Sequence, residues 1–223
     1  MSRRPYDVIT FDCYGTLIDW ERGIRDAFSA AAFAMRLPID ADAAIKLYIE
    51  IEAAVEAGPY RSYRAVLTET ARRIATRLGW ALPESRAGFL ADSMPAWPPF
   101  PDTNPALRRL IDADYRLGIL SNVDDDLLAW TRRHLAVPFE IVVTAQQAGS
   151  YKPAPHHFTM ARERIGGQPW LHAAQSYFHD VIPARALGIP VAWINRKGET
   201  ATDGGKPDRE CRNLTELADW LAP

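Results

Sequence analysis

The stretch Phe11-Asp12-Cys13-Tyr14-Gly15-Thr16-Leu17 decides the fold of this chain, because it sets an acidic residue at the end of an apolar run. That run, residues 6–11, is rich in residue types that favour strands. Gly15 allows the backbone to turn sharply just beyond it. Ligands of open α/β sheets bind outside the carboxyl ends of the strands, so the pattern predicts a functional site at Asp12. The alternative is an acid that opens a loop or caps a helix, and the rest of the chain decides between the two.

The residues after this stretch are expected to form an inserted helical cap. Ile24, Phe28 and Ala32 recur at the spacing of a helix face. A second helical pattern covers residues 62–78, and the proline-rich segment 90–102 resembles a linker. About 80 residues without a strand pattern are too many for an ordinary crossover between two strands. The sequence therefore predicts an all-α cap over residues 20–99.

Strand and helix patterns alternate through the second half of the chain. Strands are expected at residues 115–120, 139–144, 173–178 and 190–194, and helices at 124–134, 155–165, 183–187 and 214–221. This alternation is typical of a doubly wound parallel sheet with a Rossmann-like arrangement. The sequence thus predicts an α/β core made of residues 1–19 and 100–223.

Four polar side chains are expected to meet at one edge of this sheet. Ser121, Lys152 and Asp180 each follow a predicted strand or lie in the loop after one, as Asp12 does. Asp12 can act as a nucleophile, and Lys152 can offset the repulsion between it and an anionic substrate. Ser121, at the start of a helix, can bind a carboxylate or phosphate, and Asp180 can orient a water molecule or hold a cation. Cys13 is a weaker candidate nucleophile, because it has no evident His partner and adjoins a carboxylate.

Four motifs carry a resemblance to a known family. The opening stretch, Leu120-Ser121-Asn122, Tyr151-Lys152-Pro153 and Ser176-Tyr177-Phe178-His179-Asp180 resemble, in order, the four motifs of the haloacid dehalogenase superfamily. The resemblance spans the whole chain, including the position of the cap. It is strongest to the L-2-haloacid dehalogenases (type II), which share a Tyr two residues after the nucleophile. It implies a hydrolase that cleaves the carbon–halogen bond of short 2-haloacids through an aspartyl ester, giving 2-hydroxy acids and halide.

Tyr14 and Gln175 favour a dehalogenase over a phosphatase of the same fold. Phosphatases of the superfamily carry an acid at the position of Tyr14, which protonates a basic leaving group. Halide is a very weak base and needs no proton. Phosphatases also usually carry an acid at the position of Gln175, where it helps to hold Mg²⁺. No cofactor is therefore expected. The alternatives are a Mg²⁺-dependent phosphatase, with the metal on Asp12 and Asp180, and a catalytically idle binding protein.

The resemblance also implies roles for individual residues. Asp12, Lys152, Asp180 and Thr16 would be catalytic. A second group would bind the substrate carboxylate, wall the halide site or donate to the halide, namely Tyr14, Ser121, Asn122, Tyr177, Phe158, Trp20, Arg61 and Arg64. The chain departs from the dehalogenase branch at three of the compared positions. Tyr177 stands where that branch has Asn, Gln175 where it has Ser, and Phe158 where it has Tyr.

Composition narrows the class of partner. The net charge is −2, and Lys and Arg are mixed with Asp and Glu, which argues against nucleic acid and membrane surfaces as partners. Two cysteines provide no disulfide framework, so we expect a reduced, cytoplasmic protein acting on a small anionic substrate. The resemblance further implies a homodimer formed through cap helices.

Overall fold

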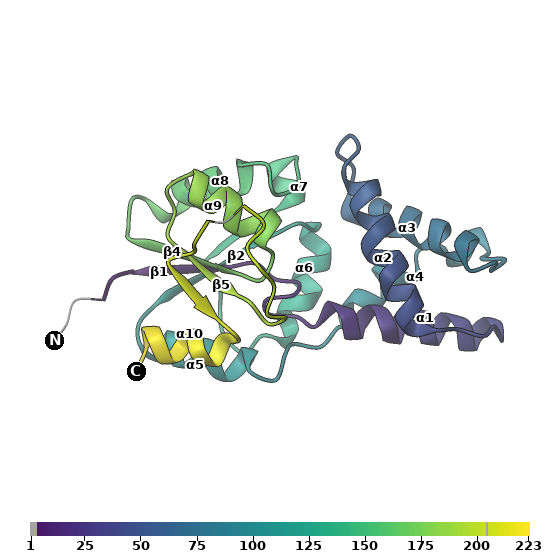
Figure 1. Ribbon diagram of the computed structural model, residues 1–223, viewed down its shortest axis with the longest axis horizontal. Coiled ribbons are helices and arrows are strands. Elements are labelled where there is room, and N and C mark those ends of the chain that lie inside the picture. Colours follow the sequence, from purple (N-terminus) through teal and green to yellow (C-terminus); the bar gives the residue numbers. More distant parts are fainter. Residues whose placement is uncertain (1–3, 204) are drawn as a thin grey trace.

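The computed structural model describes residues 4–203 and 205–223 and shows two lobes, a sheet flanked by helices and a group of helices beside it (Figure 1). The sheet has six strands in the order β3-β2-β1-β4-β5-β6, and every pair is parallel. They are β1 (Val8–Phe11), β2 (Arg116–Ser121), β3 (Ile141–Thr144), β4 (Trp170–Ala174), β5 (Val191–Ile194) and β6 (Arg209–Cys211). The predicted α/β class and parallel sheet are confirmed.

The order of the strands places a crevice beside β1. The chain moves outward from β1 to β2 and β3, then returns to the other side of β1 for β4. Such a reversal is where open α/β sheets bind their ligands. All four residues of β1 are buried, and Phe11 pairs with Ile119 on one side and Ala173 on the other. Asp12 follows directly, so the first acid after the central strand stands at the reversal.

Helices cover both faces of the sheet. α5 (Thr103–Asp112) and α10 (Leu214–Leu221) pack together on one face, and α8 (His156–Ile165) and α9 (Ile182–Ala186) lie over the other (Figure 1). α6 (Asp125–Thr131) and the short α7 (Ala145–Ala148) follow β2 and β3. The core is therefore doubly wound, as predicted.

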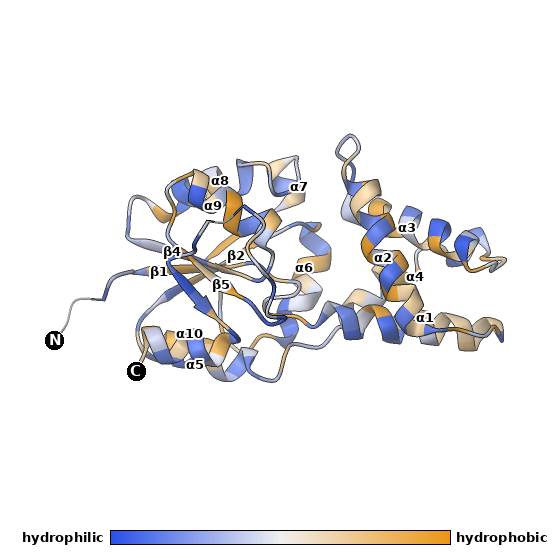
Figure 2. Ribbon diagram, in the orientation of Figure 1, coloured by the Kyte–Doolittle hydropathy of each residue, from blue (hydrophilic) through white to orange (hydrophobic). Residues whose placement is uncertain are grey.

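The second lobe is built from α1 (Trp20–Met35), α2 (Ala41–Glu56), α3 (Tyr63–Arg77) and α4 (Phe89–Ser93). Side chains of Asp19, Asp40 and Ser62 accept backbone N–H bonds at the starts of the first three helices. Hydrophobic and hydrophilic residues alternate along α1 and α2, as in helices that are buried on one side (Figure 2). We take residues 20–99 as the cap and the remainder as the core.

Two expectations about local structure were wrong, and one strand was not expected. The strand expected at residues 173–178 is β4 (Trp170–Ala174), and a π-helical turn, Tyr177–Val181, follows it. Pairing with β1, from Val8 opposite Trp170, sets this earlier register. Aromatic residues after Ala174 look strand-like in sequence, yet Tyr177 instead packs edge-on against Trp193. β6 gave no sequence signal, because it is a three-residue edge strand whose first two residues are exposed.

The first half of the proline-rich segment is part of the cap and not a linker. α4 and a 3-10 helix, Met94–Ala96, occupy it, and Leu90, Met94 and Trp97 are buried. Pro95 lies in the first turn of the short helix, where the missing N–H costs no hydrogen bond. The prolines therefore form the connection from the cap to the core only from residue 98 onward.

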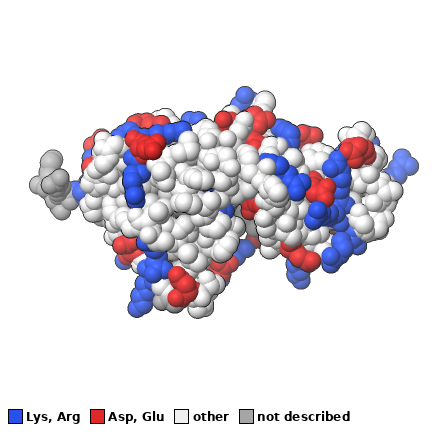
Figure 3. Space-filling view, turned by 90° about the horizontal axis from the view of Figure 1, so that it is seen from above, with Lys and Arg blue, Asp and Glu red and all other residues white. Residues whose placement is uncertain are grey.

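Surface charge and helix hydropathy bear on what the protein contacts. Lys and Arg are interspersed with Asp and Glu on the face seen in Figure 3. Within residues 4–203 and 205–223, no helix is both long and apolar enough to cross a membrane.

Candidate active site

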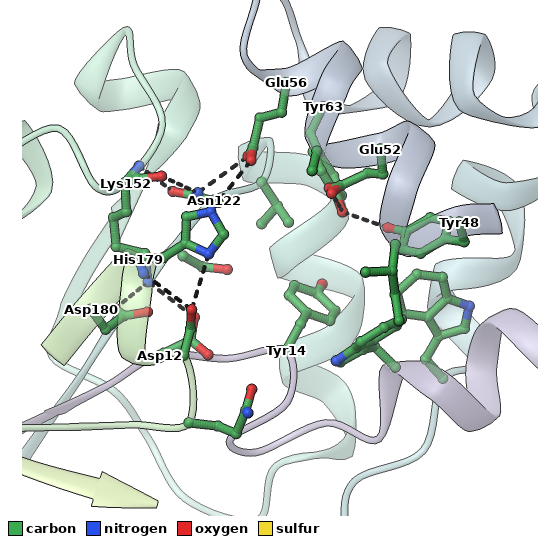
Figure 4. A pocket seen from close by; sticks show the side chains of 18 residues that line it. Asp12, Tyr14, Tyr48, Glu52, Glu56, Tyr63, Asn122, Lys152, His179 and Asp180 are labelled. Atoms are coloured by element: carbon green, nitrogen blue, oxygen red, sulfur yellow. Dashed lines mark hydrogen bonds and ion pairs between the residues drawn. The ribbon is translucent and has the colours of Figure 1, made fainter. Parts of the chain in front are cut away.

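A cavity of about 260 Å³ lies where the carboxyl ends of the central strands face the cap (Figure 4). Core residues form one wall, and cap residues form the other, namely residues of α2 with Trp20, Tyr63 and Trp97. Asp12, Lys152 and Asp180 lie in the core wall, although 28 to 168 residues separate them in sequence. The sheet thus brings together the polar groups that the sequence placed at separate strand ends.

Lys152 joins the two carboxylates. Its Nζ donates to Asp12 Oδ1 at 3.0 Å, to Asp180 Oδ1 at 2.6 Å and to the Leu120 carbonyl at 2.9 Å. The Lys152 side chain is 1% exposed. Asn122 fixes the backbone of this lysine, because its amide accepts from Lys152 N at 2.7 Å and donates to Lys152 O at 3.0 Å. All three donor positions of the ammonium are therefore used inside the protein.

Burial and charge oppose each other in this group. Burial raises the pKa of Asp12, while the ammonium of Lys152 and the hydroxyl of Thr16 act against the rise. Burial would also raise the pKa of Asp180, but Lys152 and His172 outweigh it and lower the pKa to about 2. Burial disfavours the charged form of Lys152, yet the two carboxylates raise its pKa. The geometry therefore supports an ionised Asp180 and a protonated Lys152.

Thr16 fixes the second oxygen of Asp12. Its hydroxyl donates to Asp12 Oδ2 at 2.9 Å and accepts from the Gln175 N–H at 2.8 Å. Gly15, with a φ of 97°, provides the left-handed turn that carries the chain from Asp12 to Thr16. Asp12 is thereby oriented by two side chains, one from each side of the carboxylate.

His172, which sequence reasoning did not select, holds Asp180 from behind. Its Nε2 lies 2.9 Å from Asp180 Oδ1, and its Nδ1 lies 2.9 Å from Thr10 Oγ1. Asp180 Oδ1 is thus bound twice, while Oδ2 is buried without a partner in the described residues. Ser121 Oγ is likewise buried and unpartnered, and both residues line the cavity. Unpaired buried polar atoms in residues that line a cavity are candidates to bind a ligand or a water molecule.

Four residues expected at the substrate are elsewhere. Tyr177 is buried behind the site, and its hydroxyl lies 2.6 Å from Asp203 Oδ1 and 2.8 Å from the Gly205 carbonyl oxygen. Phe158 is fully buried and packs edge-on against His172. Both face away from the cavity because they belong to the apolar layer beneath the sheet edge.

The two cap arginines are also outside the cavity, which corrects the expectation of a halide donor there. Arg64 pairs with Asp92 and Asp126 at the surface, at 3.2 and 2.9 Å. Arg61 is exposed, and its backbone carbonyl accepts from the Tyr151 hydroxyl. The start of α3 is bound to the core from its backbone side, so its arginines point outward.

Tyr14 and Trp20 line the cavity as expected, together with Ser121 and Asn122. The Tyr14 hydroxyl hydrogen-bonds Thr131 Oγ1 at 2.8 Å, and burial raises its pKa well above the ordinary value. Cys13 is fully buried, and burial next to Asp12 also raises its pKa strongly. A neutral buried thiol is a poor nucleophile, so Asp12 is the stronger candidate.

Sequence reasoning missed the cap wall, most of all Glu52 and Glu56 on α2 (Figure 4). Tyr48, Glu52 and Glu56 follow one another at intervals of four residues, which places them on one side of the helix. Tyr48 is buried. This spacing was a usable signal, because two acids share a helix face with a buried aromatic residue. His179, which also lines the cavity, lies 3.8 Å from Glu56.

The residues around Asp12 and Asp180 offer few ligands for a divalent cation. Lys152 already occupies the space between the two Oδ1 atoms, and the neighbouring Gln175 is neutral. In the described part of the chain, no group of three or more His, Cys, Asp or Glu side chains is arranged to hold a metal ion. Mg²⁺ prefers several carboxylate oxygens and waters in octahedral geometry, so this donor set fits it poorly.

Comparison with known proteins finds several 2-haloacid dehalogenases and, over 50% of this chain, a pyrophosphatase of Bacillus pumilus that is 29% identical. A family model described as haloacid dehalogenase-like hydrolase matches residues 6–172. The (S)-2-haloacid dehalogenase H-109 of Pseudomonas putida is 28% identical over 227 residues, covering 98% of this chain and 99% of that protein. A solved L-2-haloacid dehalogenase is 25% identical, with a TM-score of 0.81 and coverage of 97% and 99%. The enzyme from Xanthobacter autotrophicus, solved with chloropropionic acid covalently bound, shares the fold at 21% identity, a TM-score of 0.83 and coverage of 97% and 98%.

Proposed function

Because this chain belongs to the haloacid dehalogenase-like hydrolases, we propose that it cleaves the carbon–halogen bond of short 2-haloacids with Asp12 as the nucleophile. The matched relatives that span nearly the whole chain are (S)-2-haloacid dehalogenases. The products are halide and a 2-hydroxy acid. The reaction uses the residues of the core wall and calls for no cofactor.

One observation carries the proposal. A buried carboxylate, Asp12, opens into the cavity with Lys152 and Thr16 fixing its two oxygens. At the position where a phosphatase of this fold has its proton donor, the chain has Tyr14, whose hydroxyl is bound to Thr131. The site is therefore built for attack on carbon with a leaving group that departs without a proton.

In the first step, an oxygen of Asp12 attacks the α-carbon of the substrate. The carbon–halogen bond breaks, and the halide leaves with the bonding electrons. A single displacement of this kind inverts the configuration and forms an ester between Asp12 and the 2-hydroxy acid. Lys152 supports the step, because its charge reduces the repulsion between the carboxylate of Asp12 and the anionic substrate.

In the second step, water attacks the ester carbonyl carbon of Asp12. The free Oδ2 of Asp180 accepts a hydrogen bond from this water and takes up its proton, while Lys152 and His172 hold Oδ1. The ester bond then breaks, and the leaving alkoxide takes the proton from Asp180 to give the 2-hydroxy acid. The second proton of the water is released to solvent as the Asp12 carboxylate is restored. The oxygen of the water remains in the Asp12 carboxylate.

The substrate carboxylate is assigned to the Ser121 end of the cavity. Ser121 Oγ has no partner in the described residues, and Asn122 and Val123, which lead into α6, line the same cavity. The Asn122 side chain is already bound to Lys152, so its proposed contribution comes through its backbone and through fixing that lysine.

Chloride release from L-2-chloropropionate, measured with and without EDTA, tests the proposal. We expect release that survives EDTA and is lost in Asp12→Asn, with Asp19→Asn as a matched control on an acid that only starts α1. Absence of chloride release, together with Mg²⁺-dependent phosphate release from a generic phosphate ester, would show a phosphatase instead. Inactivity of the folded protein in both assays would indicate a binding protein.

A further inference from the structure

The cap wall of the cavity carries two glutamates that the proposed chemistry does not use. Glu56 accepts from the Asn122 amide at 3.2 Å, and its side chain is 10% exposed. Glu52 accepts from the Tyr63 hydroxyl at 3.1 Å, and Tyr63 in turn hydrogen-bonds Tyr48 at 3.0 Å. Each carboxylate thus receives a neutral hydrogen bond, and no Lys or Arg in the described lining of the cavity forms an ion pair with either of them. Lys152 acts on Glu56 only through its more distant charge, and His179 Nε2 lies 3.8 Å from Glu56 Oε2.

The balance of charge in the cavity is negative. Asp12, Asp180, Glu52 and Glu56 line it, and Lys152 is the single Lys or Arg among the described lining residues. That ammonium already serves Asp12 and Asp180. A plain 2-haloacid adds another negative charge and brings nothing to the cap wall. A substrate with a positive group at the far end would match both walls.

Several aromatic rings line the cavity together with the two glutamates. Trp20 and Tyr48 lie with their ring centres 5.5 Å apart, and Tyr14 and Trp97 lie 5.7 Å apart at right angles. All four line the same cavity. Faces of Trp and Tyr rings attract ammonium groups, most strongly where water is excluded. Two acids with several aromatic rings form a surface suited to an alkylated ammonium.

Two unpartnered polar atoms indicate that a ligand also binds at the core wall of the cavity. Ser121 Oγ and Asp180 Oδ2 are buried in residues that are 0% and 1% exposed, and neither has a hydrogen-bond partner in the described chain. They lie on the core wall, opposite α2. We infer that the substrate of this cavity is zwitterionic: a 2-halocarboxylate whose side chain ends in an ammonium group, with that group held between Glu52, Glu56 and the rings of Trp20 and Tyr48. This inference rests on the proposed function for the position of the halogen-bearing carbon.

The ionisation of the two glutamates agrees with this arrangement. Burial raises the pKa of Glu52 to about 7 and that of Glu56 to about 8. Without a cation the pair therefore holds protons near neutral pH. A bound ammonium stabilises the ionised form and releases those protons.

Two matched compounds test the inference without turnover. 4-(Trimethylammonio)butanoate has the carboxylate and the positive group, while 5,5-dimethylhexanoate replaces the charged nitrogen by carbon. We expect calorimetry to show the charged compound binding at least about tenfold more tightly, a difference of about 1.4 kcal/mol. Equal binding of the two compounds, or tighter binding of the neutral one, would overturn the inference.

Variants then locate the effect. Glu52→Gln with Glu56→Gln should bring the ratio of the two affinities close to one, while Glu50→Gln, on the exposed side of the same helix, should leave the ratio as in the wild type. A ratio that persists in the double variant would contradict the assignment of the ammonium site.

Kinetics with the 2-chloro derivatives of the same two acids complete the test. We expect kcat/KM for chloride release to be at least about tenfold higher for the charged compound. Chloride release from both at equal rates would leave the proposed function standing and overturn the zwitterion. Charge-selective binding without any chloride release would support the zwitterionic ligand and overturn the proposed function. The two failures are therefore distinguishable.

Discussion

The core wall and the cap wall of the cavity differ in how their charged groups are paired. In the core wall, Lys152 lies between two carboxylates, and the charges are satisfied by one another inside the protein. In the cap wall, Glu52 and Glu56 receive only neutral hydrogen bonds. The core wall is complete as reaction machinery before a substrate arrives. The cap wall holds two carboxyl groups that a bound cation would ionise. We therefore assign the chemistry to the core wall and the selection of the substrate to the cap wall.

The two walls are connected by a small number of polar contacts. The Asp124 carboxylate, at the start of α6 in the core, accepts from the N–H groups of Tyr63 and Arg64 at 2.9 Å each. It therefore serves the first turn of the cap helix α3 and not its own helix. The Tyr151 hydroxyl donates to the Arg61 carbonyl at 2.8 Å. These contacts help to hold the cap wall over Asp12, together with the bond from Asn122 to Glu56.

The largest effect is expected from breaking the charge balance of the core wall. Lys152→Met leaves Asp12 and Asp180 buried together without a cation, so we expect chloride release to fall by about 10³-fold or more. Removing one partner of a buried ion pair also destabilises, here by about 3–5 kcal/mol. Single-turnover kinetics and urea unfolding measure the two effects. Lys197→Met, a surface control paired with Glu21, should change neither by much.

His172→Phe should separate the two steps of the reaction. Without His172, the pKa of Asp180 rises from about 2, since one of the bonds that lower it is lost. The water step then slows by about tenfold or more, and the acid limb of the pH profile of kcat moves to higher pH. Mass spectrometry should detect more of the Asp12 ester in the steady state.

His156→Phe is the matched control for this change, because His156 is exposed and bonds Ser150 at the surface. An unshifted acid limb in His172→Phe would mean that His172 only fills space behind the site.

Asp124→Ala should loosen the cap without touching the reacting groups. Two N–H groups of α3 lose their acceptor, at a cost of about 1–2 kcal/mol. We expect KM to rise several-fold while kcat changes less, because the cap wall closes less often over the site. Asp126→Ala, which removes only a surface partner of Arg64, provides the comparison. A loss confined to kcat would place Asp124 in the chemistry.

The smallest effect concerns stability and pH. The folded chain holds protons on Glu52 and Glu56 up to pKa values of about 7 and 8, whereas 4.5 is the ordinary value. Between about pH 4.5 and 8 the folded state thus binds more protons than the unfolded chain, so stability falls as pH rises. Tyr48, Tyr63, Asn122, His179 and Lys152 are the polar and titratable groups that face the pair.

Glu56→Gln removes the part of this pH-dependent loss of stability that Glu56 causes. The melting temperature of the variant should therefore exceed that of the wild type by roughly 2–4 °C at pH 9 and by less at pH 6. Calorimetric scans at the two pH values measure the difference. Equal shifts at both values would show that Glu56 is ionised throughout this range.

The sequence was informative for the core and much less so for the cap. Asp12, Lys152 and Asp180 could be placed because parallel strands must end on one edge, and Ser121 followed from the same rule. His172 could not be placed, since a His inside an apolar strand has no signature of its own. Tyr177 was misplaced because the end of β4 depends on its pairing with β1. Phe158 was misplaced because it lies on the buried side of α8, where it packs against His172.

Which cap residues line the cavity depends on the rotation of α2 about its own axis. Which side of α2 faces Asp12 is set by the packing of whole helices, so Glu52 and Glu56 were overlooked. The choice of Arg61 and Arg64 followed from the need for a cation near the leaving group. Contacts with Asp92, Asp126 and Tyr151 draw that part of the cap outward.

A single turnover in ¹⁸O-labelled water tests most directly whether Asp12 is the nucleophile. With enzyme in excess over L-2-chloropropionate, the hydroxyl oxygen of the product should come from Asp12 and carry no label. The label should appear in the peptide that contains Asp12. Labelled product from the first turnover, with an unlabelled Asp12 peptide, would show that water attacks the substrate directly and would contradict the account.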